Sequence, residues 1–278
     1  MFMSSADSSD GRKWFTSIAF VGLLMASCNA AETKVDTANL PVIDTPAVAK
    51  PKMATSAPAN ATYVYLSFDD GPQPGTMACY KVCKSLGVPA TFYMIGIHLA
   101  DKRSISWYDS VRAEPSFLIA NHSNTHAYRN RYTTYYTNPD SALADFMKAD
   151  QRLQVPYKIA RFPGNNAWAL QGKFRTTKLT RALARAMDSV GYQVLGWDVE
   201  WRFKGGDMPV QSVDGLLAEL DAVVKRKELF TARHIVILAH DRMFRRAEDA
   251  AKLKAFIEKL QARNYVFATM DQYPGVKK

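Results

Sequence analysis

The sequence predicts an α/β protein in which about seven parallel strands and their connecting helices form a distorted barrel. Two observations support this prediction. From Tyr63 onward, short apolar runs alternate with helix-like stretches, and reactive polar residues directly follow several of the apolar runs. In barrels and in open α/β sheets, the carboxyl ends of the strands build the functional site. An open doubly wound sheet is the alternative arrangement of the same elements.

The strand-like and helix-like segments follow one another in a regular order. We expect strands over residues 63–68, 90–95, 117–120, 158–162, 192–197, 234–239 and 265–268. We expect helices near residues 76–87, 139–153, 177–190, 210–227 and 246–262. Parallel strands need a long crossover connection, usually a helix, so this alternation favours parallel pairing.

The amino-terminal residues have the composition of an export signal. Arg12 and Lys13 precede an apolar run over residues 14–25, which is short for a membrane span. Small residues before Cys28 resemble a lipoprotein processing box, and ordinary cleavage after Ala30 is the alternative. We therefore expect an exported, periplasmic or cell-envelope protein that a lipid on Cys28 anchors to the membrane.

A change in composition then separates a linker from a folded domain. Residues 29–61 are rich in Ala, Pro, Thr and Lys and have no apolar periodicity, which predicts a flexible tether. We divide the chain into a signal peptide (1–28), this tether (29–61) and a catalytic domain (62–278). The chain is 47% hydrophobic, enough for a full core in the domain.

Charge and cysteine content narrow the classes of partner. The net charge of +10 favours anionic partners, but the charges are scattered and no nucleic-acid motif accompanies them. We interpret the short basic clusters at 225–227 and at Arg242 with 245–246 as mostly solvated helix faces. Cys79 and Cys83 are spaced four residues apart, which is poor spacing for a disulfide, so we expect two thiols. Neither a nucleic-acid partner nor a protein partner is predicted.

Two adjacent carboxylates follow the first predicted strand. Asp69 and Asp70 stand directly before Gly71-Pro72, a dipeptide typical of turns. Neighbouring side chains on an extended backbone point in different directions. One carboxylate can therefore bind a metal while the other faces a bound water.

Histidines follow two further strands. His122 and His126 are spaced four residues apart, so in a helical turn both imidazoles lie on one face and can share an ion. Together with Asp70 they would supply three ligands and leave positions for water and substrate. His240 ends an apolar run and could protonate a leaving group near neutral pH. His98 falls at no such strand end, and we expect it, like His234, to be structural.

These motifs together resemble the polysaccharide deacetylases of carbohydrate esterase family 4. The matching segments are Leu66–Pro72, His122–His126, Arg161–Pro163, Trp197–Trp201 and Ile237–His240, and they extend over about residues 62–270. The resemblance implies a distorted barrel, often with seven strands. It also implies one divalent ion, most often Zn²⁺, held by Asp70, His122 and His126.

The resemblance implies roles for further residues. Asp69 would be the base that deprotonates a bound water, and His240 the acid that protonates the departing amine. Arg161 would orient Asp69. Gly164 stands where the family has an aromatic residue, so a backbone N–H remains there but an aromatic wall does not. Either Glu200 or Asp198 would tune His240; we assign Glu200, and we place Gly164, Asp198 and Trp201 among the substrate-binding residues.

The expected activity is removal of N-acetyl groups from a cell-envelope or exported polysaccharide, peptidoglycan or chitin-like, with release of acetate. O-deacetylation of an acetylated polysaccharide uses the same catalytic set and is the nearest alternative. Two histidines and a carboxylate can also hold iron(II) for oxygen chemistry, which would leave Asp69 and His240 unexplained. A non-catalytic, carbohydrate-binding lipoprotein is the third alternative.

Overall fold

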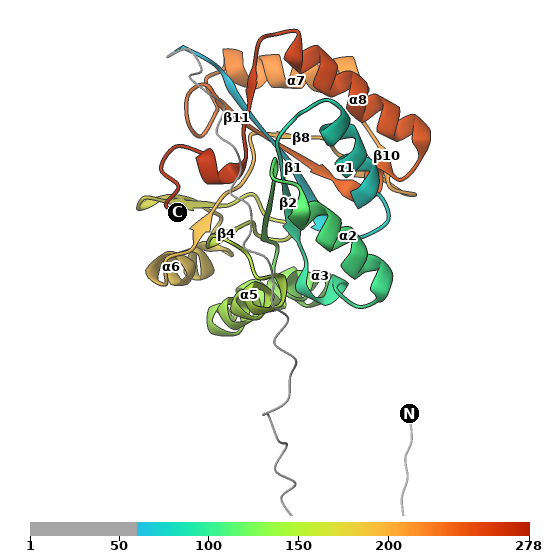
Figure 1. Cartoon of the computed structure of the whole chain (residues 1–278). Coiled ribbons are helices and arrows are strands. Elements are labelled where there is room, and N and C mark those ends of the chain that lie inside the picture. The colour runs from blue at the N-terminus through green and yellow to red at the C-terminus, as the bar shows by residue number, and fades with distance from the viewer. Residues whose placement is uncertain (1–59) are drawn as a thin grey trace, which may run out of the picture. The chain divides into compact units, whose positions relative to one another are not determined.

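A ten-stranded sheet lies at the centre of the computed structural model of the chain, which describes residues 60–278 (Figure 1). The strands are β1 (Tyr63–Gly71), β2 (Ala90–Met94), β3 (Phe117–Asn121), β4 (Ile159–Ala160), β5 (Trp168–Leu170), β6 (Lys173–Arg175), β7 (Gln193–Val194), β8 (Val199–Glu200), β11 (His234–His240) and β12 (Val266–Phe267). Their order is β6-β5-β7-β4-β3-β2-β1-β11-β8, and β12 pairs with β1 outside this path. A separate hairpin joins β9 (Phe203–Lys204) and β10 (Met208–Pro209).

Seven neighbouring strands, from β7 through β4, β3, β2, β1 and β11 to β8, are all parallel. β5 pairs antiparallel with both β7 and β6. Within residues 60–278, β6 and β8 are the two ends of the sheet and do not pair with each other, so the curled sheet stays open. The prediction of a distorted barrel with about seven parallel strands is confirmed.

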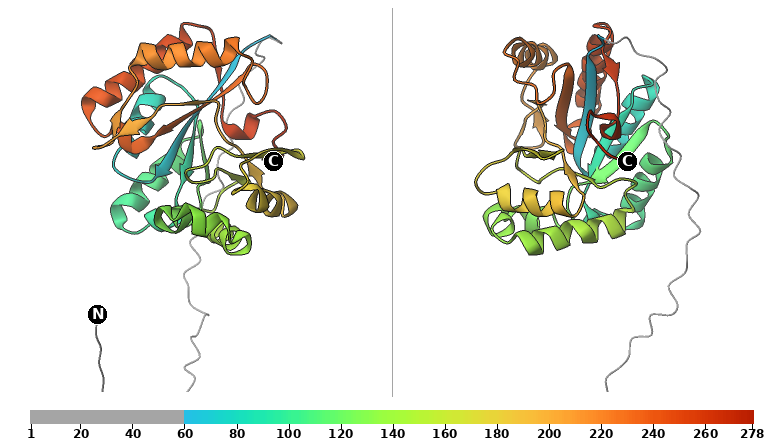
Figure 2. Two further views of the ribbon diagram at one scale, coloured as in Figure 1. Left: turned by 180° about the vertical axis from the view of Figure 1, so that it is seen from behind. Right: turned by 90° about the vertical axis from the view of Figure 1, so that its left-hand side faces the viewer.

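The helices are α1 (Thr76–Ser85), α2 (Lys102–Ala113), α3 (His126–Asn130), α4 (Tyr132–Tyr136), α5 (Pro139–Leu153), α6 (Arg181–Ser189), α7 (Val213–Lys225) and α8 (Ala247–Gln261). Short 3₁₀ turns occur at η1 (Gly96–His98), η2 (Asp241–Phe244) and η3 (Met270–Gln272). Figure 2 shows α5 together with α6 on the β3–β7 side of the sheet, and α7 with α8 on the β11–β8 side. None of the helices within residues 60–278 is long and apolar enough to cross a membrane.

Several elements differ from the predicted set, and β5, β6, β9, β10 and α4 are among those that were not predicted. The segment 265–268 forms β12, but it pairs only with the start of β1, and the seventh parallel strand is β8. The helix α2 was not predicted, although Asp101 and Ser104 form a capping box at its amino terminus, which is a readable signal. The predicted helix at 139–153 coincides with α5.

Alternation along the strands divides the core into an outer and an inner layer. On β1, Val64 and Leu66 pack with the surrounding helices, whereas Tyr65 belongs to an inner cluster with residues of β2, β3 and β11. Cys79 and Cys83 are free, fully buried thiols of the outer layer, and burial raises the pKa of both. The predicted signal peptide, Cys28 and nearly all of the tether lie outside the described residues.

Candidate active site

The same alternation carries the predicted catalytic side chains to the inner side of the sheet at its carboxyl edge. Asp69 lies four residues after the inner Tyr65 on β1, and Arg161 lies two residues after the inner Ile159 of β4. Asp69 also pairs in register with His240, the last residue of β11. Strand geometry therefore assembles side chains that are far apart in the sequence.

Asp70, His122 and His126 bring three ligand atoms together, all within 4.8 Å of one another. Oδ1 of Asp70 lies 3.4 Å from Nε2 of His122 and 3.1 Å from Nε2 of His126. Asp70 and His122 are buried, whereas the side chain of His126 is 17% exposed. The group is thus closed on the protein side and reachable from solvent at His126.

The other contacts of the two imidazoles leave their Nε2 atoms free to bind a cation. Nδ1 of His122 lies 3.0 Å from the carbonyl oxygen of Arg161, and Nδ1 of His126 lies 2.5 Å from Oδ1 of Asn130. Because these oxygens only accept, each Nδ1 is the donor in its contact, and Nε2 is the ring atom that faces Asp70. Oδ1 of Asp70 is buried without a hydrogen-bond partner among the described residues. Two imidazole nitrogens and a carboxylate oxygen that face one another fit a divalent ion with nitrogen and oxygen ligands, such as zinc.

The electrostatics of the group keep the carboxylate charged. Burial opposes ionisation of Asp70, but contacts with His122 and His126 outweigh it and hold the pKa of Asp70 well below its usual range. Burial likewise disfavours protonation of His126, yet its contact with Asp70 raises the pKa of His126. The site therefore offers an ionised carboxylate to a cation.

A local irregularity of β1 lets both adjacent aspartates face the interior. Asp70 has a φ of 77°, in the left-handed region, and the pairing register of β1 with β2 shifts between Asp69 and Gly71. In a regular strand Asp70 would point to the opposite side from Asp69; the bulge re-aims it. Nδ1 of His98 lies 2.8 Å from the carbonyl oxygen of Asp70, and the Gly71–Pro72 peptide bond is cis. Asp69 and Asp70 both face the interior because of this bulge; a fully extended backbone would point them to opposite sides.

The second histidine is held in a left-handed turn, not in the right-handed helical turn that we predicted. His126 and the four residues after it have φ values between 51° and 68°. Such a conformation costs roughly 1–2 kcal/mol per residue for side chains other than glycine, so neighbouring contacts must stabilise it. Oγ1 of Thr125 accepts a hydrogen bond from the N–H of Tyr128 at 2.9 Å and caps the turn.

Asp145 of α5 is the main support of the loop between the two histidines. Its Oδ2 accepts hydrogen bonds from the N–H groups of Asn124 and Thr125, both at 3.2 Å, and from the hydroxyl groups of Thr125 and Tyr135. The carboxylate is 8% exposed, so these bonds form away from bulk water. Asp145 thus fixes the backbone between His122 and His126.

Arg161 holds the carboxylate of Asp69 in place. Its guanidinium is fully buried and donates to Oδ1 of Asp69 at 2.8 Å and to Oγ of Ser67 at 2.7 Å. It also donates to the carbonyl oxygens of Leu195 and Gly196. The other carboxylate oxygen of Asp69 faces the histidines, 3.6 Å from Nε2 of His122. In this position Arg161 can hold the carboxylate of Asp69 in one orientation.

His240 approaches the other carboxylate oxygen of Asp70, the one that does not face His122 and His126. Its Nε2 is 4.0 Å from Oδ2 of Asp70, and its ring packs edge-on against Phe203 with centroids 4.8 Å apart. Burial lowers the pKa of His240, although the carboxylates of Asp69 and Asp70 oppose the shift. A histidine that loses its proton readily is suited to donating it to a departing amine.

Gly164 lies against the ring of Tyr132. Its φ is +62°, and a Cβ atom at this position would come within 2.7 Å of that ring. Tyr132 in turn packs edge-on against His126. An aromatic wall is therefore present, supplied by Tyr132 of α4 instead of residue 164. Trp168 does not supply this wall, because it is fully buried in the inner core against Phe230.

The structure contradicts two predicted substrate contacts. Trp201 is fully buried against Phe244 and Phe256 and donates its indole N–H to the carbonyl oxygen of Gln211. The side chain of Asp198 is also inaccessible; its carboxylate accepts hydrogen bonds from the N–H groups of residues 230 and 236. Both residues stabilise the loops behind the site.

The predicted contact between Glu200 and His240 is not made. Nδ1 of His240 is buried with no hydrogen-bond partner among residues 60–278. Glu200 is half-buried, and burial raises its pKa. Asp198 does not reach His240 either, because its carboxylate is used by backbone groups.

Two features of the site were not foreseen. Arg242, which the sequence placed in a solvated basic cluster, forms an ion pair with Oδ2 of Asp70. A cavity of about 350 Å³ adjoins the site behind His98 and is lined by Pro72, Gln73, Pro74, Ile97, His98, Ala100, Asp101, Arg103, Ser104 and Trp107. In the sequence, the one indication that Arg242 lies near the site is its position two residues after His240.

Comparison with known proteins agrees with these features. A family model described as polysaccharide deacetylase matches residues 56–165. A chitooligosaccharide deacetylase of Rhizobium leguminosarum is 41% identical over 154 residues, which cover 54% of this chain and 61% of that one. A peptidoglycan-N-acetylglucosamine deacetylase of Bacillus cereus is 26% identical over 212 residues, which cover 73% of this chain and 67% of that one.

The fold is shared with solved structures. The catalytic domain of peptidoglycan N-acetylglucosamine deacetylase from Eubacterium rectale superposes with a TM-score of 0.57 at 20% identity, covering 81% of this chain and 98% of that one. At this identity the likeness concerns the fold alone. Together, the family model over residues 56–165, the sequence relatives and the fold show that the chain is similar to the polysaccharide deacetylases of carbohydrate esterase family 4.

Proposed function

We propose that the chain is a metal-dependent hydrolase that removes N-acetyl groups from a cell-envelope or exported polysaccharide, either peptidoglycan or chitin-like. Asp70, His122 and His126 would hold one divalent ion, Zn²⁺. The observation that carries the proposal is the buried, unpartnered Oδ1 of Asp70 facing two imidazole nitrogens. An oxygen in that position, with no donor of its own, is suited to a cation.

The reaction is hydrolysis of an amide to acetate and a free sugar amine. An ion bound to the three ligands would polarise the acetyl carbonyl and acidify a bound water. Asp69, anchored by Arg161, would take the proton of that water through the carboxylate oxygen that Arg161 leaves free. His240 would then deliver a proton to the nitrogen as the C–N bond breaks. The backbone N–H of Gly164 and the ring of Tyr132 would border the acetyl group.

The proposed polymeric substrate has support from the relatives and from the shape of the site. The similar proteins named above act, by name, on chitooligosaccharides and on peptidoglycan. The cavity beside His98 combines the half-buried ring of Trp107 with polar groups of Gln73 and Arg103. An aromatic face with polar edges suits a sugar ring. We propose that a neighbouring sugar of the same polymer occupies this cavity.

Export and anchoring are further parts of the proposal. Residues 1–28 would direct export, Cys28 would carry the lipid, and residues 29–61 would tether the domain near its polymer. If Cys28 is the lipid site, Cys28→Ser protein should leave the membrane fraction of cells that express it. Lipid labelling of the Cys28→Ser protein would contradict this assignment.

The central experiment measures acetate released from peptidoglycan, chitooligosaccharides and acetylxylan. We expect release from an N-acetylated polymer by the wild type and its loss after chelation, because the water then lacks an activating ion. Asp69→Asn should lower the rate about 10²–10⁴-fold, since the general base is removed while its shape remains. Asp140→Asn, which changes an exposed carboxylate of α5, is the matched control and should retain full activity.

The outcomes separate the alternatives. Release from acetylxylan only would identify an O-acetyl esterase. Polymer binding without acetate release would identify a non-catalytic carbohydrate-binding protein. Oxygen consumption with iron(II) would identify an oxygenase. Unchanged release by the Asp69→Asn protein would rule out Asp69 as the base.

A further inference from the structure

Arg242 lies directly on the proposed metal site. It belongs to η2, two residues after His240, and its Nη2 forms an ion pair with Oδ2 of Asp70. Its side chain is 31% exposed, compared with 45% for the nearby Arg245, which pairs with Asp207 at the surface. Of these two arginines in one basic cluster, Arg242 alone reaches the site.

The fold holds Arg242 in this position. The preceding Asp241 is fully buried and accepts hydrogen bonds from Thr76 and from Nε2 of Gln73, which ties η2 to the β1–α1 loop. The guanidinium also lies over the ring of Phe203, 5.5 Å from its centroid. Its Nε is buried without a hydrogen-bond partner among the described residues. The arginine is therefore packed in place, and its contact with Asp70 is part of the built site.

The contact divides the two oxygens of Asp70 between different partners. Oδ1 faces the imidazoles of His122 and His126, and Oδ2 faces Arg242. The neighbouring Asp69 is paired in the same way with Arg161. Each of the two carboxylates thus has a guanidinium partner. A divalent ion at Oδ1 shares its carboxylate with a fixed positive charge, which repels it and weakens its attraction to Asp70.

We propose that Arg242 is an internal counter-cation of Asp70 that competes electrostatically with the divalent ion and lowers the metal affinity of the site. The inference rests on the proposed metal site and deepens it. Without metal, Arg242 compensates a carboxylate that is otherwise buried next to a second carboxylate. With metal, it keeps binding reversible, so the ion exchanges with free metal in the surroundings.

The test measures the zinc dissociation constant of the full protein by competition with a chromophoric chelator. Arg242→Met keeps the apolar stem and removes the charge; we expect it to bind zinc about tenfold more tightly, the order expected for screened repulsion between a single and a double charge. Arg242→Lys keeps the charge and should stay near the wild-type affinity. Arg245→Met removes a charge of the same cluster outside the site and should not alter the affinity.

Thermal unfolding supplies a second readout that does not depend on catalysis. Tighter binding to the folded state raises the melting temperature further, so a fixed zinc concentration should stabilise Arg242→Met more than the wild type. An unchanged or weaker zinc affinity of Arg242→Met would overturn the inference and identify Arg242 as an orienting support of Asp70. Wild-type protein that binds no zinc would instead overturn the proposed metal site itself.

Discussion

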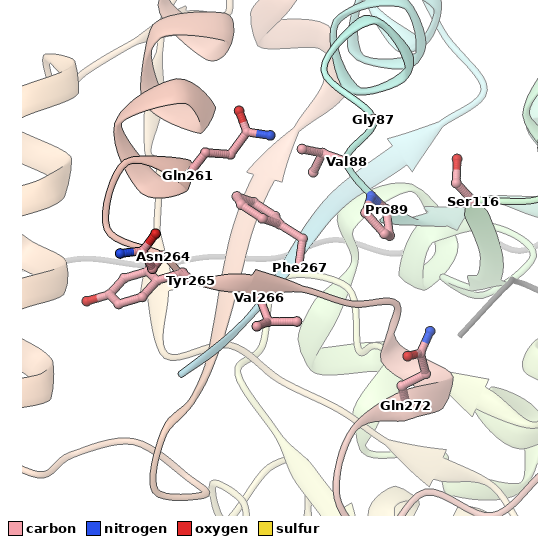
Figure 3. A pocket seen from close by; sticks show the side chains of 10 residues that line it. All are labelled: Gly87, Val88, Pro89, Ser116, Gln261, Asn264, Tyr265, Val266, Phe267 and Gln272. Carbon is pink, nitrogen blue, oxygen red and sulfur yellow. The ribbon is translucent and has the colours of Figure 1, made fainter. Parts of the chain in front are cut away.

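The two ends of the barrel are both hollowed, but different kinds of side chain line them. At the amino-terminal ends of the strands, a cavity of about 600 Å³ lies beside β12 and the starts of β2 and β3 (Figure 3). Its walls are Gly87, Val88, Pro89, Ser116, Gln261, Asn264, Tyr265, Val266, Phe267 and Gln272, without a carboxylate, a histidine or a cationic group. At the carboxyl ends, carboxylates, imidazoles and guanidinium groups converge within contact distance.

The difference shows that the size of a hollow does not identify the functional end. The larger of these two cavities offers apolar surface and amide groups, and water can satisfy the hydrogen bonds of the amides. The carboxyl end instead gathers charged groups that are expensive to bury unless they are paired or bind an ion. An arrangement that costs free energy and is nonetheless maintained is better explained by chemistry than by stability.

The sharpest way to test this contrast is to truncate one side chain at each end. His240→Ala should lower the rate of acetate release about 10²–10³-fold, because the proposed acid is lost, with little change in melting temperature. Phe267→Ala at the other end should instead lower the free energy of unfolding by about 1–2 kcal/mol, because a half-buried ring is removed, and leave the turnover number unchanged. A large loss of turnover in Phe267→Ala would abolish the distinction between the two ends.

Asp241, at the carboxyl end, tests the contrast between the two ends through the pH dependence of the free energy of unfolding. Burial raises the pKa of Asp241 to about 8, although hydrogen bonds from Thr76 and Gln73 oppose the shift. The folded state therefore keeps a proton that the unfolded chain loses near pH 4, so the contribution of Asp241 to stability falls as the pH rises from about 4 to 8. The limiting slope is about 1.4 kcal/mol per pH unit.

Removal of that carboxyl group should remove the slope. We expect the free energy of unfolding of the wild type to decrease, relative to Asp241→Asn, between pH 5 and pH 8 in chemical denaturation series. Gln272→Ala, a substitution at the opposite cavity, should run parallel to the wild type over this range. Parallel curves for the wild type and Asp241→Asn would mean that Asp241 is ionised in the folded state.

The smallest expected effect concerns the cavity at the carboxyl end. Trp107→Ala should raise the KM for acetylated oligosaccharides about tenfold, the order of one lost aromatic contact, without lowering kcat on a monosaccharide. Steady-state kinetics on substrates of increasing length would measure this split. An equal effect on all lengths would remove the proposed sugar position beside His98.

Much of the site was readable from the sequence because its residues follow directly after buried strands. Once β1, β3, β4 and β11 are recognised, period-two alternation brings Asp69, His122, Arg161 and His240 to one edge. The same logic failed at 198–201, where β8 is only two residues long, and Trp201 turned into the core behind it. Short strands carry too little pattern to assign a face.

The conformations that shape the ligands could not be predicted. The bulge at Asp70 and the left-handed turn after His126 depend on distant partners, among them Asp145. Asp145 looks like an ordinary residue of an amphipathic helix, because nothing in its sequence neighbourhood shows that it meets the loop between the histidines. The role of Arg242 was missed for the same reason: its partner, Asp70, is far away in the chain.

The most direct test of the account is the stoichiometry of zinc binding at the three proposed ligands. Titration of metal-free wild-type protein should give one equivalent of bound zinc, and Phe267→Ala should match it. His126→Ala, which removes the most exposed ligand, should lose that equivalent while remaining folded. A full equivalent bound with undiminished affinity by the His126→Ala protein would show that the ion binds elsewhere.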